Sequence, residues 1–182
     1  MNLRLFAVRS AHQPANAKFH ATKYMYMHLF DMHNNEPLLP ALPCMCANFR
    51  RTSRALTHLY ETALRPLGLR TTQFTILQAL ALAGEVSQGQ LGEMLAMDST
   101  SLTRTLAIMR RQGWLAERPS KDRRERRLDL SSAGKAQLKR ALPVWEKVQS
   151  RLGRRLGQQA WDDLLQLTHQ VAGLVSTKGD SL

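Results

Sequence analysis

The sequence predicts a mainly α-helical protein that contains one short two-stranded β-ribbon. Apolar residues recur at steps of three and four over most of the chain from residue 46 onward, which is the period of an amphipathic helix. Aromatic residues make up only 6% of the chain, so we expect a core rich in Leu and Ala, residues that favour helices. Two short strand-like runs on either side of a charged turn, within residues 113–132, predict the ribbon.

Residues 1–43 differ in composition from the rest of the chain. They contain four of the six His and four of the eight Met residues, show no sustained period, and end with Pro37, Pro40 and Pro43. We expect a poorly ordered extension with a short helix around 18–32, which need not belong to the native product because several later Met residues offer alternative starts. A His-rich metal tract is the alternative, but the histidines lack ligand spacing, so no metal and no cofactor are predicted.

Residues 44–182 are predicted to form one domain with dimerisation helices at about 46–65 and 132–176. Pro66 ends the first of these helices, and Pro143 breaks or bends the long helix that begins the second range. The apolar stripes of these helices are too long for one small lobe to bury, so we expect a partner chain to cover them in a homodimer. The stripes consist of Leu56, Leu59, Leu64, Trp161, Leu164, Leu165, Leu167 and Val171.

A helix between the two dimerisation segments opens the central region, residues 67–131. Thr71 or Thr72 is expected to cap this helix, which ends near Gly84. The residues expected to face inward are Phe74, Leu77, Leu80 and Ala81.

Two further short helices, predicted over 88–95 and 99–112, are separated by a tight turn. Ser87 and Gln90 form a capping box for the first helix, and Asp98 caps the second. Two short helices joined in this way make a helix-turn-helix candidate. The two strands of the ribbon follow, and they lead to a long helix that Ser131 or Ser132 caps. The ribbon after the second short helix completes a winged helix-turn-helix.

The second of these short helices has one apolar and one polar side. Leu102, Leu106 and Met109 lie on one face, whereas the first turns of the other side carry small hydroxyls and an arginine. Small hydroxyls allow close approach to DNA, and Arg can bind a guanine through two hydrogen bonds, so this side suits the reading of base edges. A solvated amphipathic helix explains the pattern equally well when the helix is taken alone. The candidate DNA-binding residues here are Ser99, Thr100, Ser101, Thr103 and Arg104.

The charge of the chain favours the DNA-binding interpretation. The formal net charge is +12 and the pI about 10.7, which favours a polyanionic partner. Residues 104–127 contain nine Lys or Arg and three acids, a surplus of six positive charges beside the candidate reading helix. The tip of the ribbon can enter an adjacent minor groove, where Arg is attracted. We expect Arg123 and Arg124 to project furthest, and Asp122 to brace the turn because an unpaired acid would repel phosphate there.

The run "LGEMLAMDSTSLTRTLAIMRRQGWLAERPSKDRRERRLDLSSAGKAQL" resembles the core of the MarR family of winged helix-turn-helix regulators. The resemblance covers roughly residues 46–176. Its most specific parts are an Asp-x-Arg signature, here Asp122 and Arg124, and a Leu-Ser-x-x-Gly segment that ends at Gly134. It implies that Asp122 holds the wing turn, that Arg124 enters the minor groove, and that the protein is a homodimeric repressor responsive to a ligand or an oxidant.

Two candidate sensors follow from this resemblance. Cys44 and Cys46 precede the first long helix, where the helix N-terminus and nearby Arg residues would favour the thiolate, although small buried cysteines would give the same pattern. The competing sensor is a small-molecule pocket between the dimer helices and the DNA-binding lobe. His58, Tyr60 and Phe74 are conceivable lining residues for it, but each fits the core better.

Other classes of protein fit the sequence less well. The chain has no Gly-rich phosphate loop, metal-ligand set or nucleophile motif, so an enzyme is not predicted. RNA readers usually offer stacking aromatics, whereas the basic region has only Trp114. No run of eighteen apolar residues exists, and we recognise no export signal, so we expect a cytoplasmic protein that does not act at a membrane. The prediction is a sequence-specific regulator on a palindromic double-stranded operator; a basic nucleic-acid-binding protein without ligand response is the alternative.

Overall fold

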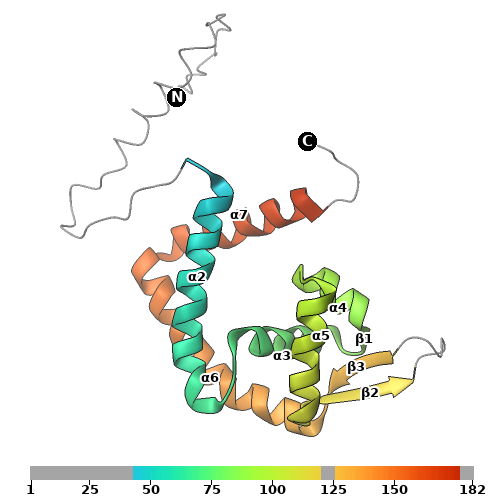
Figure 1. Cartoon of the computed structure of the whole chain (residues 1–182). Coiled ribbons are helices and arrows are strands. Elements are labelled where there is room, and N and C mark those ends of the chain that lie inside the picture. Colours follow the sequence, from blue (N-terminus) through green and yellow to red (C-terminus); the bar gives the residue numbers. More distant parts are fainter. Residues whose placement is uncertain (1–42, 120–125, 177–182) are drawn as a thin grey trace, which may run out of the picture. The chain divides into compact units, whose positions relative to one another are not determined.

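The computed structural model describes residues 43–119 and 126–176. Within the described residues the chain divides into two units, one up to residue 54 and one from residue 55 onward. The extension predicted over 1–43 lies outside the described residues except for its last position. The elements in chain order (Figure 1) are α2 (Met45–Leu64), the 3-10 helix η1 (Arg65–Leu67), α3 (Thr71–Ala83), β1 (Val86–Ser87), α4 (Gln88–Leu95), α5 (Ser99–Arg111), β2 (Leu115–Pro119), β3 (Arg126–Leu130), α6 (Ser132–Leu156) and α7 (Gln158–Ser176).

Helix α3 is the centre of the core in the second unit. It contacts α4, α5, α6 and β3, so its buried residues surround the helix rather than forming one stripe. Phe74, Leu77 and Leu80 are buried as predicted, and Ile76 and Ala79 are buried as well. Ala81 is exposed, so its predicted inward position is wrong. A helix packed on several sides has no single inward face that sequence periodicity can identify.

The start of α3 also differs from prediction. The residue that caps the helix is Arg70, not Thr71 or Thr72. The side chain of Gln73 accepts a hydrogen bond from the Arg70 amide at 2.9 Å, and the Thr71 amide donates to Glu61 at 3.1 Å. Glu61, nine and ten residues before its two partners, therefore accepts hydrogen bonds at the start of α3, where a local threonine was expected to be the acceptor.

Helices α4 and α5 form the predicted helix-turn-helix. The capping box of α4 is present, with Ser87 Oγ accepting from the Gln90 amide and Gln90 Oε1 accepting from the Ser87 amide. Ala96 ends α4 in the left-handed conformation, with φ of 48°. The two helices meet through apolar side chains of the core, which include Leu91, Leu102, Leu106 and Met109.

The sheet has three antiparallel strands in the order β1-β3-β2, instead of the predicted two. The wing strands β2 and β3 lie side by side (Figure 1), with Leu115 opposite Leu130. Strand β1 adds the pair Val86 and Leu128 on the other edge of β3. It is only two residues long and runs directly into the α4 capping box, so it carries no strand period of its own.

Helix α6 runs through Pro143 without a break, so the alternative of a broken helix is wrong. Helix α7 follows and contacts α6. Leu64, predicted as part of a dimerisation stripe, is fully buried in the core. Leu164, Leu165 and Leu167 of α7 are exposed on the described chain. No helix in the described ranges is both long and apolar enough to span a membrane.

Candidate nucleic-acid interface

The first turn of α5 is held by an aspartate. Asp98 has extended backbone angles, and its Oδ1 accepts a hydrogen bond from the Ser101 amide at 2.8 Å. This bond lowers the pKa of Asp98, so the cap stays ionised at neutral pH. The predicted N-cap is therefore confirmed, and it fixes the orientation of the residues that follow.

The two sides of α5 separate as the sequence predicts. Leu102, Leu106 and Met109 are buried almost completely against the core. The structure brings the five candidate residues together on the exposed part of the N-terminal turns. These are Ser99, Thr100, Ser101, Thr103 and Arg104, all of which are exposed.

Thr103 has a second connection that the sequence did not indicate. Its Oγ1 accepts a hydrogen bond from Gln88 Nε2 at 2.8 Å and donates one to the Ser99 carbonyl at 2.7 Å. Gln88 is the first residue of α4, so this hydroxyl joins the two helices of the helix-turn-helix. These bonds occupy the hydroxyl proton and one lone pair of Thr103, so its side chain links the two helices of the motif. Gln88 lies fifteen residues away, and no local pattern marks it.

Arg104 lies on the exposed side of the N-terminal turns of α5. Its side chain is exposed and makes no hydrogen bond or ion pair with the residues that the structure describes. A guanidinium without an internal partner keeps all five donors available for an acceptor such as a guanine edge or a phosphate.

Other cations near the wing bind within the protein. Arg110 at the end of α5 forms an ion pair with Glu117 on β2. Arg118 on β2 forms one with the Glu85 carboxylate at 3.0 Å, and Arg127 on β3 donates to the Glu85 carbonyl at 3.3 Å. Three of the nine positive residues counted in the basic segment therefore have partners within the protein.

The arrangement around Glu85 follows from the strand register. Arg118 and Arg127 stand directly opposite each other on β2 and β3, where like charges destabilise a sheet. Glu85 precedes β1 and offers a carboxylate to one and a carbonyl to the other. It thereby reduces the repulsion at the base of the wing. The predicted tip residues, Asp122 and its neighbours Arg123 and Arg124, lie outside the described residues.

The wing leads into α6 through a tight junction. Ser131 Oγ accepts from the Gly134 amide at 3.0 Å and donates to the Gly113 carbonyl at 2.6 Å. The Ser131 amide donates to the Trp114 carbonyl at 3.1 Å. Ser131 thus caps α6 as predicted and also ties that helix to the segment between α5 and the wing.

The candidate redox residues lie at the start of α2. Cys44 and Cys46 are both free thiols with exposed side chains, so the alternative of small buried residues is wrong for the described chain. Asn48 donates to the Cys44 carbonyl through both its amide and its side chain. The thiols are therefore accessible at an ordered helix start.

A groove lies between α2 and α6. Its volume is about 480 Å³, and it combines apolar residues with two cations, Lys147 and Arg151. None of the three lining residues considered from sequence is in it. Phe74 is buried and Tyr60 half-buried against the core, where burial raises the Tyr60 pKa, whereas His58 is exposed. The groove is lined by Leu59, Thr62, Ala63, Pro143, Val144, Lys147, Val148 and Arg151.

Comparisons with known proteins agree with this geometry. Residues 67–125 match the family model described as the MarR family. An uncharacterised HTH-type transcriptional regulator of Bacillus subtilis, YwoH, is 26% identical over 81 residues, which is 44% of this chain and 59% of that relative.

Two solved structures extend the likeness. The transcriptional regulator MosR of M. tuberculosis, solved in complex with DNA, is 32% identical with a TM-score of 0.62, over 72% of this chain and 98% of that one. A point mutant of MarR from E. coli, complexed with operator DNA, has a TM-score of 0.64 at 22% identity, over 70% of this chain and 92% of that one, and shows likeness of fold.

Proposed function

The chain belongs to the MarR family of transcriptional regulators, and we propose that it binds a palindromic operator in double-stranded DNA as a homodimer and represses transcription. The observation that carries this proposal is the surface of α5. Asp98 caps the N-terminal turns of this helix, and three buried apolar residues anchor its opposite side in the core. The exposed side of these turns bears small hydroxyls beside Arg104, which has no partner among the described residues. MosR, which is 32% identical to this chain and was solved in complex with DNA, supports DNA binding by this chain.

The proposed contacts divide into two kinds. Ser99, Thr100, Ser101 and Arg104 face base edges in the major groove, and Thr103 orients them through Gln88. Arg123 and Arg124 contact the flanking minor groove, with Asp122 bracing their turn. Base contacts supply sequence preference, whereas wing contacts add affinity that depends on salt and on groove width.

The homodimer is supported by the apolar surface of α7. Leu164, Leu165, Leu167 and Leu174 are exposed on a 19-residue helix, and a second chain would remove them from water. A two-fold dimer also presents two copies of α5, which matches the symmetry of a palindrome.

A footprint on the DNA upstream of the gene itself tests the proposal. We expect protection of two inverted half-sites about one helical turn apart, and a particle of about twice 20.6 kDa by light scattering. A reporter downstream of that site should be repressed when the protein is present, in the cytoplasm where we propose that it acts. Uniform binding to any duplex would favour the alternative of a basic nucleic-acid-binding protein.

We propose two routes of release for the repressor. The groove between α2 and α6 has an apolar lining with Lys147 and Arg151 beside it, which suits a small amphipathic anion. The accessible thiols Cys44 and Cys46 suit an oxidant. Release by a panel of aromatic carboxylates that is lost in a Lys147→Ala, Arg151→Ala variant supports the groove. Release by peroxide that dithiothreitol reverses supports the cysteines.

A further inference from the structure

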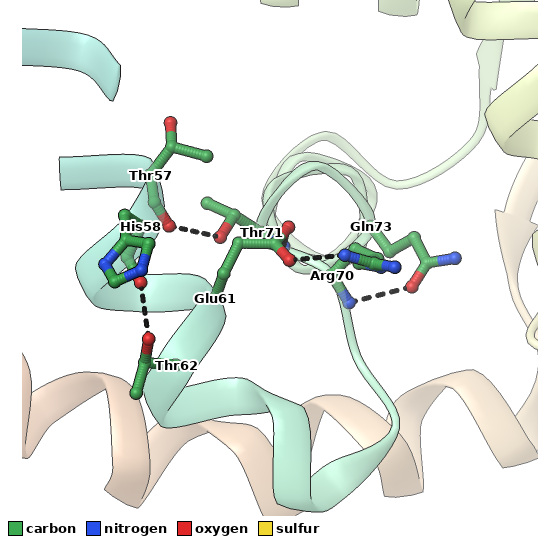
Figure 2. Close-up of polar contacts among 7 residues, drawn as sticks. All are labelled: Thr57, His58, Glu61, Thr62, Arg70, Thr71 and Gln73. Atoms are coloured by element: carbon green, nitrogen blue, oxygen red, sulfur yellow. Dashed lines mark hydrogen bonds and ion pairs between the residues drawn. The ribbon is translucent and has the colours of Figure 1, made fainter. Parts of the chain in front are cut away.

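A carboxylate on α2 binds the start of α3 at two points. Glu61 Oε2 forms an ion pair with Arg70 at 2.8 Å, and its Oε1 accepts the Thr71 amide at 3.1 Å. Figure 2 shows the side chain of Glu61 reaching from its helix toward the residues that begin α3. It is only 21% exposed, whereas the side chain of Arg70 is 75% exposed. The first amide of α3, which has no partner inside its own helix, is therefore satisfied by a different helix.

Two further bonds hold the same place. Thr71 Oγ1 donates to the Thr57 carbonyl at 3.5 Å, one turn before Glu61 on α2. The buried side chain of Gln73 accepts from the Arg70 amide, which fixes the backbone at the helix start. We call Glu61, Arg70 and Thr71 the brace. It joins residues whose relative position sets the direction in which α3 leaves the connector, residues 65–70.

The connector, residues 65–70, is also held by α6. The buried side chain of Gln137 donates to the Leu67 carbonyl at 2.9 Å, and Arg140 donates to its Oε1 at 3.2 Å. Gly68 turns the chain between the two anchors with φ of 66°. The connector is thus fixed to both α2 and α6, which lie within the ranges predicted to form the dimer contact.

The direction of α3 matters because α3 carries the DNA-binding elements. It contacts α4, α5 and β3, whose side chains form one core with its own. A change in the direction of α3 would therefore move α5, the proposed recognition helix, together with the elements packed around it, and would not distort α5. Resting on the proposed function, we infer that the brace is a positioning device that sets the distance between the two recognition helices, and so selects the half-site spacing that the dimer accepts.

The test measures affinity against a set of operators that differ only in spacing. Each base pair added between the half-sites rotates one against the other by about a tenth of a turn, so a rigid dimer should accept one spacing. For Glu61→Ala we expect the preference for that spacing to fall by about 2- to 30-fold, while discrimination between correct and mutated half-site bases stays as in the wild type. Arg70→Ala should act in the same direction, and the double variant should be no worse than the stronger single one.

His58→Ala is the matched control. His58 is an exposed neighbour of Glu61 on α2 (Figure 2), and its carbonyl accepts a hydrogen bond from the Thr62 hydroxyl. We expect a wild-type spacing profile from this variant. If Glu61→Ala does not fold by circular dichroism, Glu61→Gln decides, because it retains an acceptor for the Thr71 amide but loses the charge that holds Arg70.

The outcomes separate this inference from the proposed function. Absence of any discrete footprint from the wild type would refute operator binding itself. A wild type with a clear spacing preference that Glu61→Ala and Glu61→Gln leave unchanged would overturn the brace. Loss of half-site base discrimination with spacing unchanged would also overturn it, since the brace would then act inside the lobe.

Discussion

A Cβ atom on residue 134 would lie 2.1 Å from the carbonyl oxygen of Trp114. The first turn of α6 therefore lies against the backbone that leads from α5 into the wing, with no room for a side chain. The same carbonyl accepts the Ser131 amide, so the close approach is held by a hydrogen bond. This contact explains why the Leu-Ser-x-x-Gly segment ends in glycine at this position.

Gly134→Ala is expected to lower the free energy of unfolding by about 1–3 kcal/mol, because the backbone at Trp114 must move to admit the methyl group. Gly173→Ala is the matched control. Residue 173 also lies within a helix, but its Cβ would meet nothing within 4 Å, so alanine should stabilise by about 0.5–1 kcal/mol. Urea denaturation at one fixed protein concentration measures both. Equal effects of the two substitutions would contradict the steric explanation.

The brace predicts a specific pH dependence. The hydrogen bond from Arg70 is the main cause that lowers the pKa of Glu61. A lowered folded-state pKa contributes stability that is present above the unfolded value, about 4.3, and is lost as the pH falls through the folded value. We expect Glu61→Gln to be less stable than wild type by about 0.2–1 kcal/mol at pH 7, and this difference to shrink in acid below pH ~4. A difference that is constant from pH 7 to pH 3 would show that the charge of Glu61 is not involved.

Arg104 and Thr103 should fail in different ways when substituted. Arg104→Ala is expected to relax sequence preference at one base-pair position in each half-site. If Arg104 makes two hydrogen bonds to a guanine, the loss of binding free energy should be about 1–3 kcal/mol per contact. Thr103→Val removes the bonds to Gln88 and Ser99, so affinity should fall without a change of preferred base. Binding curves on permuted operators distinguish the two. Equal weakening of all sequences by Arg104→Ala would assign Arg104 to a phosphate.

Two substitutions at the predicted wing tip test its role. For Asp122→Ala, a simple charge effect predicts tighter DNA binding, whereas a structural role predicts weaker binding. Arg124→Ala should weaken operator binding and lower the salt slope by about one unit per half-site if a phosphate contact is lost. If Arg124 reads groove width instead, the loss should be larger on A·T-rich flanks. Asp122→Ala should weaken binding as well, although it removes a negative charge, because the turn loses the side chain that stabilises it. Tighter binding by Asp122→Ala would show that simple charge dominates.

The exposed thiols of Cys44 and Cys46 predict a reversible response to oxidants. Peroxide should release operator DNA through a disulfide that links subunits, visible as a band of about twice 20.6 kDa on a non-reducing gel. A reductant should restore binding. The double variant Cys44→Ser, Cys46→Ser should remain bound in peroxide, and release by that variant would rule out the cysteine route.

The features that the sequence determined by itself depend on neighbours within one helical turn. Asp98 and the Ser87–Gln90 box cap their helices as predicted, because a cap and its amide lie three residues apart. The alternation in β3 is equally local, and it buries Leu128 and Leu130 on one side of the strand. These signals were sufficient for the helix-turn-helix, the wing strands and the candidate surface of α5.

Tertiary structure alone decided the contacts between segments distant in the chain. The Thr71 amide at the start of α3 donates to Glu61, ten residues earlier in the chain. The side chain of Gln137 donates to a carbonyl 70 residues away, and Glu85 joins two arginines on opposite strands. A polar side chain can bond any partner that folding brings within about 3 Å, and its own neighbours in sequence do not specify that partner. Periodicity and capping therefore predicted which elements form, whereas long-range hydrogen bonds decided how the connector and the base of the wing are held.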